Sequence, residues 1–135
     1  MRDGYTREIE RGDLESPDFL RFIAGHQISI VVVSGADAGS EFTIEGPTTT
    51  LGRGESADIR FADPALSSEH AAVEFTSDGF RLRDLGSRNG TRLNGGDVKA
   101  AELKHGDRIE LGGRTFQFVL TPRSRSPKTW EVPVG

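Results

Sequence analysis

The chain has 135 residues, which is enough for one compact domain of ordinary size with short flanking segments. Its 21 Asp and Glu residues outnumber its 17 Lys and Arg residues, and the net charge of -4 argues against a surface that binds nucleic acid or an anionic membrane. The sequence has no cysteine, which excludes disulfides, thiolate zinc sites and thiol nucleophiles.

The N-terminal region lacks the features of a secretory signal. Residues 1–26 carry acidic side chains throughout, without the basic start and apolar centre of a signal peptide. The longest purely apolar run, Ile30–Val33, is far shorter than the roughly 20 residues that a membrane-spanning helix needs. We therefore expect a cytoplasmic protein with no membrane partner.

One short helix is predicted within an N-terminal extension of residues 1–26. Ser16 is suited to cap the helix and Pro17 to occupy its first position. Asp18 follows in the first turn, where a negative charge is favoured, and Gly25 is typical of a helix end. We expect the helix over Ser16–Gly25 to pack its apolar face on the domain that follows.

Residues 27–121 are typical of an all-β fold, an antiparallel β-sandwich. Short stretches rich in Val, Ile, Phe and Thr alternate with glycine-rich or polar turns, and helical periodicity is nearly absent. Apolar and polar residues alternate clearly in Phe80–Arg83 and Phe116–Phe118, so one face of each strand would be buried. The expected strands are Gln27–Val33, Ser40–Glu45, Thr48–Leu51, Asp58–Phe61, His70–Phe75, Phe80–Asp84, Thr91–Leu93, Val98–Glu102, Arg108–Leu111 and Arg114–Leu120.

Asn-Gly steps predict a tight turn on either side of Thr91–Leu93. Both residues of such a pair tolerate the positive φ that short hairpin turns require, so Asn89-Gly90 and Asn94-Gly95 are turn candidates. After residue 121 the chain becomes basic and contains proline and serine. We interpret residues 122–135 as a tail or linker that cannot bury enough apolar surface to fold alone.

Three predicted loops combine cations, hydroxyls and glycines beyond what a simple turn needs: 51–54, 67–70 and 86–91. A phosphorylated side chain brings about 1.5–2 negative charges and three acceptor oxygens, so its receptor needs a guanidinium, hydroxyl donors and free N–H groups at one point. Arg53, Ser67 and the backbone around Ser68 supply such a set. Arginine suits this role because its planar fork holds two phosphate oxygens and stays charged.

The loops carry three motifs in a fixed order, Gly52-Arg53, Ser67-x-x-His70 and Asn89-Gly90-Thr91. Their combination, on a background of short strands, resembles the forkhead-associated (FHA) domain family over roughly residues 28–120. The resemblance implies an eleven-strand β-sandwich whose loops at one end bind phosphothreonine in an extended peptide. It also implies a phosphothreonine-dependent recognition module in Ser/Thr kinase signalling, whose partner is a phosphothreonine-containing protein or peptide.

The resemblance assigns roles to individual residues. It implies that Arg53 and Ser67 bind the phosphate and that the side-chain amide of Asn89 holds the peptide backbone. His70 would have a structural role and brace the Ser67 loop, and Gly52 would keep the backbone close behind Arg53. Gly90 would supply the positive φ of the turn after Asn89, and neither glycine would touch the ligand directly.

Two further phosphate-binding candidates depart from the family pattern. Ser68 stands where the family often has Arg, Lys or Asn, and we expect it to make a weaker contact. Arg88 stands where the family often has Thr or Ser. The extra cation would bind the phosphate or select an acidic residue in the peptide.

Each site residue also has a simpler structural explanation. Arg53 would be a solvated surface residue, Ser67 a capping residue and Asn89 a turn residue. A second candidate function is therefore a phosphate-independent scaffold that uses a sandwich face or the Ser16–Gly25 helix to hold a partner.

Catalysis is not expected. Ser67 and His70, with an acid such as Asp63 or Asp84, could be drawn as a hydrolase triad, but no Gly-x-Ser-x-Gly elbow surrounds Ser67. The sequence has no nucleotide-binding glycine loop followed by Lys and Ser or Thr, and the remaining histidines have no partner cluster that would hold a metal. We expect neither a cofactor nor a metal.

Thr6 is a candidate phosphorylation site within the chain itself. It lies in Tyr5-Thr6-Arg7-Glu8-Ile9, where an aliphatic residue follows three positions after the threonine, a position that families of this type often discriminate. Phosphorylated Thr6 would dock on its own domain or a neighbour's and block other partners. The simpler alternative is a tail without this role.

Overall fold

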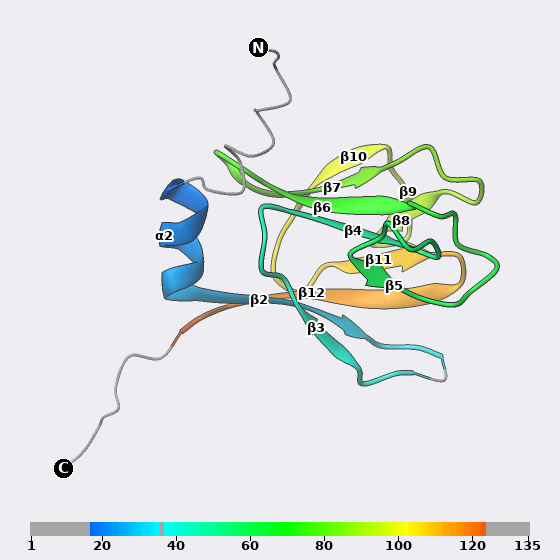
Figure 1. Cartoon of the computed structure of the whole chain (residues 1–135), viewed down its shortest axis with the longest axis horizontal. Helices are drawn as coiled ribbons and strands as arrows, with labels where there is room; N and C mark the ends of the chain where they lie inside the picture. The colour runs from blue at the N-terminus through cyan, green and yellow to red at the C-terminus, as the bar shows by residue number, and fades with distance from the viewer. Residues whose placement is uncertain (1–16, 36, 124–135) are drawn as a thin grey trace.

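The computed structural model describes residues 17–35 and 37–123. Two β-sheets pack face to face and one short helix, α2 (Pro17–Gly25), lies at one end of the sandwich (Figure 1). The predicted fold class, an antiparallel β-sandwich of about eleven strands with a short N-terminal helix, is confirmed. No helix of the described residues is long and apolar enough to cross a membrane.

The first sheet has five strands in the order β10-β7-β6-β4-β5, and the second has six in the order β3-β2-β12-β11-β8-β9. Neighbouring strands are antiparallel except β4 and β5, which pair in parallel. The bounds are β2 (His26–Val32), β3 (Glu41–Thr43), β4 (Thr48–Gly52), β5 (Ile59–Arg60), β6 (Ala71–Thr76), β7 (Gly79–Asp84), β8 (Thr91–Leu93), β9 (Gly96–Asp97), β10 (Ala100–Leu103), β11 (Arg108–Leu111) and β12 (Arg114–Pro122).

The strand predictions differ from the structure mainly in the short pieces. The expected strand Asp58–Phe61 is reduced to β5, and Ser40–Glu45 is reduced to β3. The short strand β9 was not expected, because its two residues are exposed and polar or glycine. It exists because the Asn94-Gly95 turn, with φ of 51° and 89°, folds the chain back onto β8.

The core lies between the inward faces of the two sheets. The strongest alternation in the sequence becomes burial, with Leu82 on β7 and Phe116 and Phe118 on β12 all fully buried. Fully burying a large apolar side chain contributes about 1.5–3 kcal/mol to folding. The long β12–β2 pairing, from Phe116 opposite Val32 to Pro122 opposite His26, runs the length of the sandwich.

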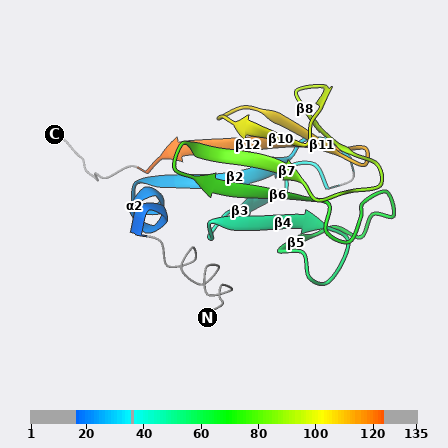
Figure 2. The ribbon, with the colours of Figure 1, turned by 90° about the horizontal axis from the view of Figure 1, so that it is seen from above.

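Helix α2 covers one end of this core. Phe19 is 1% exposed, and its ring meets Phe75 edge-on with centroids 5.4 Å apart. Phe22 packs against Phe80 at 5.5 Å, whereas Leu20 on the outer face is 51% exposed. The loops that follow β4, β5 and β7 lie at the opposite end of the sandwich (Figures 1 and 2).

We predict that the helix contributes to the stability of the domain. Phe19→Ala should lower the free energy of unfolding by about 3 kcal/mol, because it empties a buried site between the helix and the β6–β7 hairpin. The neighbouring Leu20→Ala is the control and should change it by less than about 0.5 kcal/mol. Urea unfolding followed by circular dichroism measures both values. Equal effects of the two substitutions would contradict the packing of α2 on the core.

Candidate functional site

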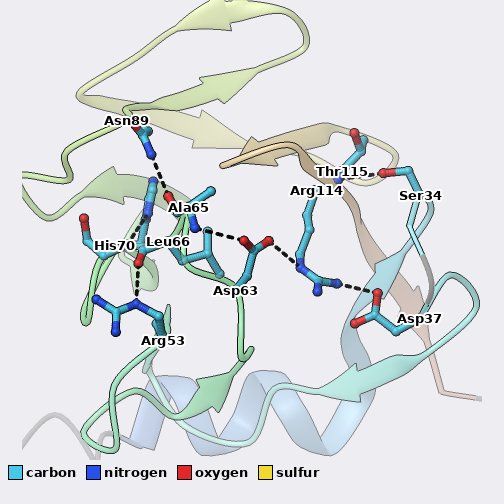
Figure 3. Close-up of polar contacts among 11 residues, drawn as sticks. Ser34, Asp37, Arg53, Asp63, Ala65, Leu66, His70, Asn89, Arg114 and Thr115 are labelled. Carbon is cyan, nitrogen blue, oxygen red and sulfur yellow. Dashed lines mark hydrogen bonds and ion pairs between the residues drawn. The ribbon is translucent and has the colours of Figure 1, made fainter.

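The three loops far from α2 form what we call the rim: residues 53–58, 61–70 and 85–90. They follow β4, β5 and β7, so the strand order of the first sheet brings them to the same end. The rim holds every predicted site residue except Gly52, which ends β4 directly before it, and Thr6, which lies outside the described residues. Figure 3 shows two of the polar contacts that connect the loops, from Arg53 to Leu66 and from Asn89 to Ala65.

Arg53 is anchored to the second loop by one edge of its side chain. Its backbone N–H donates to the Ser67 carbonyl at 2.9 Å, and its Nε donates to the Leu66 carbonyl at 3.0 Å (Figure 3). Arg53 is exposed, and its two Nη groups have no hydrogen-bond or ion-pair partner among the described residues. Because Nε is held by the second loop, the two charged Nη groups of Arg53 are left free on the side of the guanidinium away from that loop.

Gly52 allows the first and second loops to touch. A Cβ at this position would lie 2.2 Å from the Ser68 carbonyl oxygen and 2.9 Å from that of Ser67. Contacts under about 3.0 Å are essentially never made by real Cβ atoms, so any other residue would push the Ser67–Ser68 backbone away. The glycine thus places Arg53 against the segment that carries the Ser67 hydroxyl.

His70 joins the second loop to the third. The ring is fully buried, and its Nδ1 accepts the backbone N–H of Ser67 at 3.1 Å. Because Nδ1 accepts, the neutral ring carries its hydrogen on Nε2, which donates to the Gly90 carbonyl at 2.7 Å. Both ring nitrogens are bonded to backbone groups, so the ring is not aimed at the Ser67 hydroxyl as a catalytic base would be.

Arg88 and Asn89 are brought to the second loop by two more hydrogen bonds. The backbone N–H of Arg88 donates to Ser67 Oγ at 3.0 Å, and Asn89 Nδ2 donates to the Ala65 carbonyl at 2.8 Å. The Arg88 guanidinium and Asn89 Oδ1 have no hydrogen-bond partner among the described residues. Of the Asn89-Gly90 pair only Gly90 has a positive φ, 86°, so this step is not the two-residue hairpin turn that Asn-Gly pairs favour.

Asp84 holds the third loop in shape, a role that sequence analysis did not assign. Its carboxylate accepts bonds from the N–H groups of Gly86 and Ser87, at 3.0 and 3.1 Å, and from the hydroxyls of Ser87 and Thr91, both at 2.6 Å. Burial alone would raise the pKa of Asp84, but these hydrogen bonds outweigh it and lower the pKa below its ordinary value.

Comparisons with known proteins assign a family to this geometry. The sequence model of the FHA domain matches residues 49–112, which contain the whole rim. The oxoglutarate dehydrogenase inhibitor of Corynebacterium jeikeium is 32% identical to this chain over 121 residues, or 88% of this chain and 84% of the relative. The chain belongs to the FHA domain family.

Other relatives match a shorter stretch of the chain. The glycogen accumulation regulator GarA of Mycolicibacterium smegmatis is 37% identical over 95 residues, a match that covers 70% of this chain and 60% of GarA. The chain therefore spans less than two thirds of GarA and, at 66%, just under two thirds of the oxoglutarate dehydrogenase inhibitor of Corynebacterium diphtheriae.

Solved FHA domains share the fold. A structure from an analysis of phosphothreonine-dependent FHA domain interactions superposes with a TM-score of 0.63 at 27% identity and covers 69% of this chain and 95% of that one. The FHA domain of FhaA, solved in complex with the intracellular domain of Rv3910, gives 0.61 at 27% identity and covers 67% of this chain and 98% of that one.

In this FHA domain, a charged network supports the second loop from behind. Arg114, at the start of β12, donates through Nε to Asp63 at 3.0 Å and pairs through Nη1 with Asp37 (Figure 3). Its guanidinium also lies 5.2 Å from the Phe61 ring centroid. The other carboxylate oxygen of Asp63 accepts the N–H of Ala65 at 2.9 Å, so the network fixes the residue whose carbonyl holds Asn89.

Two shallow hollows flank the Asn89-Gly90 step of the FHA domain. One, of about 300 Å³, is lined by Ala65 and by the β11–β12 turn at Gly112. The other, of about 410 Å³, lies between Arg88 and the segment before β10, and we call it the Lys99 hollow. The rim thus offers a hollow on each side of the residue that the family pattern assigns to the peptide backbone.

We predict that Asp84 stabilises the domain in a pH-dependent way. Asp84→Asn should lower the free energy of unfolding by about 2 kcal/mol at pH 7, because a neutral amide cannot accept all these bonds. The folded pKa lies below the unfolded one, so the stabilisation is present above the unfolded value, about 3.9, and is lost as the pH falls through the folded value.

Urea unfolding at pH 7 and in steps down to strongly acidic pH therefore compares wild type with Asp84→Asn. The difference between them should shrink as the pH falls. Asp78→Asn, in the exposed β6–β7 turn, is the control and should change stability by less than about 0.5 kcal/mol. A difference for Asp84→Asn that persists unchanged at the lowest pH would contradict the role of the carboxylate charge.

Proposed function

We propose that this FHA domain binds a phosphothreonine-containing protein or peptide at the rim. Arg53, Ser67, Ser68 and Arg88 would hold the phosphate, and Asn89 would hold the peptide backbone. The observation that carries the proposal is the pair of guanidinium groups, from Arg53 and Arg88, whose Nη atoms have no partner among the described residues. The loop of Arg53 is bonded to the second loop through Ser67 and Leu66, and His70 fastens the second loop to the loop of Arg88. Gly52, His70 and Gly90 would support the site without touching the ligand.

The hydrogen bonds of the rim leave suitable donors for a phosphate. Ser67 Oγ accepts from the Arg88 N–H, so the hydroxyl hydrogen of Ser67 remains available to donate. The Arg88 N–H is used in the same bond, so Arg88 would contribute through its side chain. The Ser68 N–H has no partner among the described residues and adds a backbone donor.

The expected strength follows from these contacts. A hydrogen bond to a charged group contributes about 1.5–3 kcal/mol net. A few such bonds, less the free-energy cost of association, give an affinity in the micromolar range, about -8 kcal/mol. Binding of this strength suits a reversible, kinase-controlled partner.

We infer that the protein acts by binding rather than by catalysis. The names of two relatives, a glycogen accumulation regulator and an oxoglutarate dehydrogenase inhibitor, describe regulators and support this class. A cytoplasmic location belongs to the same proposal, because protein kinases and their ATP are found there.

We also propose that the chain is divided into an N-terminal extension of residues 1–26, the FHA domain over residues 27–121 and a tail over residues 122–135.

We predict that Arg53→Ala weakens phosphopeptide binding by at least about 2 kcal/mol, because it leaves phosphate charge unpaired. The ligand is chosen from a library of phosphothreonine peptides with randomised flanks, screened beside the same peptides without phosphate. Isothermal titration calorimetry then compares wild type, Arg53→Ala and the control Arg21→Ala, an exposed arginine on α2.

Asn89→Ala in the same series should weaken binding although the phosphate contacts are intact. Unchanged affinity of Arg53→Ala would remove Arg53 from the site, and unchanged affinity of Asn89→Ala would remove Asn89. Equal capture of phosphorylated and unmodified peptides would favour the phosphate-independent scaffold. Among the described residues of the helix, Leu20 is the one large apolar side chain that is exposed for that alternative, since Phe19 is buried against the sandwich.

Thr6 is the proposed source of an internal ligand. Helix α2, which begins at Pro17, lies at the end of the sandwich opposite the rim. Strand β12 runs between these two ends of the sandwich, and its nine residues span about 30 Å. The chain from Thr6 to Pro17 extends to at most about 36–40 Å. It is long enough to reach the rim of the same molecule only when nearly extended, so docking on a neighbour is equally compatible with the geometry.

We predict that phosphorylation of Thr6 shifts the NMR signals of rim residues such as Arg53 and weakens binding of the library peptide. Kinase-treated wild type is compared with kinase-treated Thr6→Ala, which should show neither change. Dilution distinguishes the two modes, because docking on a neighbour is lost at low concentration. Identical NMR signals of the rim residues before and after Thr6 phosphorylation would contradict the proposal that phosphorylated Thr6 binds the rim.

A further inference from the structure

The Lys99 hollow carries positive charge beside the proposed phosphate site. Arg88 and Lys99 line it from two different segments, the third loop of the rim and the residues before β10. Neither side chain has a hydrogen-bond or ion-pair partner among the described residues. Two unpaired cations that face one hollow repel each other, and an anion between them would relieve that repulsion.

The acid in the same hollow offsets at most one of these two cations. Asp97 also lines it, but its carboxylate pairs with Arg92 at 3.2 Å. The hollow on the other side of Asn89 differs, because its lining includes both Arg92 and Glu110, which lie opposite each other in the β8–β11 pairing. The excess of positive charge is therefore on the Lys99 side alone.

Asp84 connects the two segments that line the Lys99 hollow, the third loop of the rim and the residues before β10. The backbone N–H of Asp84 donates to the Lys99 carbonyl at 2.8 Å, while its carboxylate binds Ser87 in the loop that carries Arg88. The Val98 N–H donates to the Thr91 carbonyl at 3.0 Å, which connects the segment before β10 to β8. The spacing of the two backbone segments that carry the cations is thus set by the fold and does not depend on a ligand.

We propose that the Lys99 hollow is a second anion-binding subsite that receives an acidic or phosphorylated side chain near the phosphothreonine in the same peptide. The inference rests on the proposed function, since the hollow shares Arg88 and Asn89 with the rim. Arg88 lies between the two anions and would contact either one. Lys99 contacts only the second, and it therefore sets a preference for sequence rather than for phosphothreonine itself.

Lys99→Gln is the decisive variant because it removes one charge outside the phosphate-binding set. Lys104→Gln is the matched control, since Lys104 is an exposed lysine just beyond the other end of β10, near the α2 end of the sandwich. The probes are phosphothreonine peptides with neutral flanks, and the same peptides with one Asp or one phosphoserine moved through each flanking position. Affinities are measured by fluorescence anisotropy at low and high salt.

We expect one flanking position at which an anion tightens binding to wild type by about fivefold at low salt, as for a partly exposed ion pair. The comparison of Asp with phosphoserine at that position tells which source of negative charge the subsite prefers. Lys99→Gln should lose the gain and keep its affinity for neutral peptides within about twofold. Lys104→Gln should keep both.

Other outcomes would overturn the proposal. If neutral phosphothreonine peptides bind but no flanking anion improves affinity, the subsite does not exist and the proposed function stands. If Lys99→Gln keeps the gain, the preference arises elsewhere and the assignment of Lys99 is wrong. If wild type binds no phosphothreonine peptide of either kind, the proposed function itself fails and the subsite falls with it.

Discussion

The buried ring of His70 makes one site out of two separate loops. It accepts a hydrogen bond from the Ser67 backbone and donates one to the Gly90 carbonyl, so both loops are fixed to the same rigid group. Ala71, which begins β6, follows directly and is itself buried in the core. Replacing the ring would leave a backbone donor and a backbone acceptor without partners, which is costly in a buried position. His70 therefore connects the geometry of the rim to the packing of the core.

The rim also shows how a chain with a net charge of -4 can present a local site for anions. Asp63 in the rim pairs with Arg114, and beside the rim Asp97 pairs with Arg92 while Asp84 accepts hydrogen bonds from donors of the third loop. The charges of these three aspartates are thus paired or stabilised within the protein. The Nη groups of the Arg53 guanidinium and the whole Arg88 guanidinium have no such partner among the described residues, so both remain available to bind an anion.

Much of the fold was predictable from the sequence, because the sequence patterns that indicate strands and helices are local. Alternating residues such as Phe116–Phe118 predicted core strands, and the order Pro17, Asp18 and Gly25 predicted the helix. The supporting contacts were not predictable. Arg114 and Asp63 are 51 positions apart, and only the strand order brings them together. The Lys99 hollow likewise depends on the pairing of β10 with β7, which no local pattern specifies.

The central claim is that groups on the rim bind a phosphorylated threonine in concert. Amide NMR titration tests it most directly, with one phosphothreonine peptide selected from the library and its unphosphorylated twin. The account predicts that the phosphorylated peptide shifts the amide signals of Arg53, Ser68, Arg88 and Asn89, that residues of α2 stay unchanged, and that the twin shifts none of them. Shifts of the same size with both peptides, or shifts confined to α2 and the sheet faces, would contradict it.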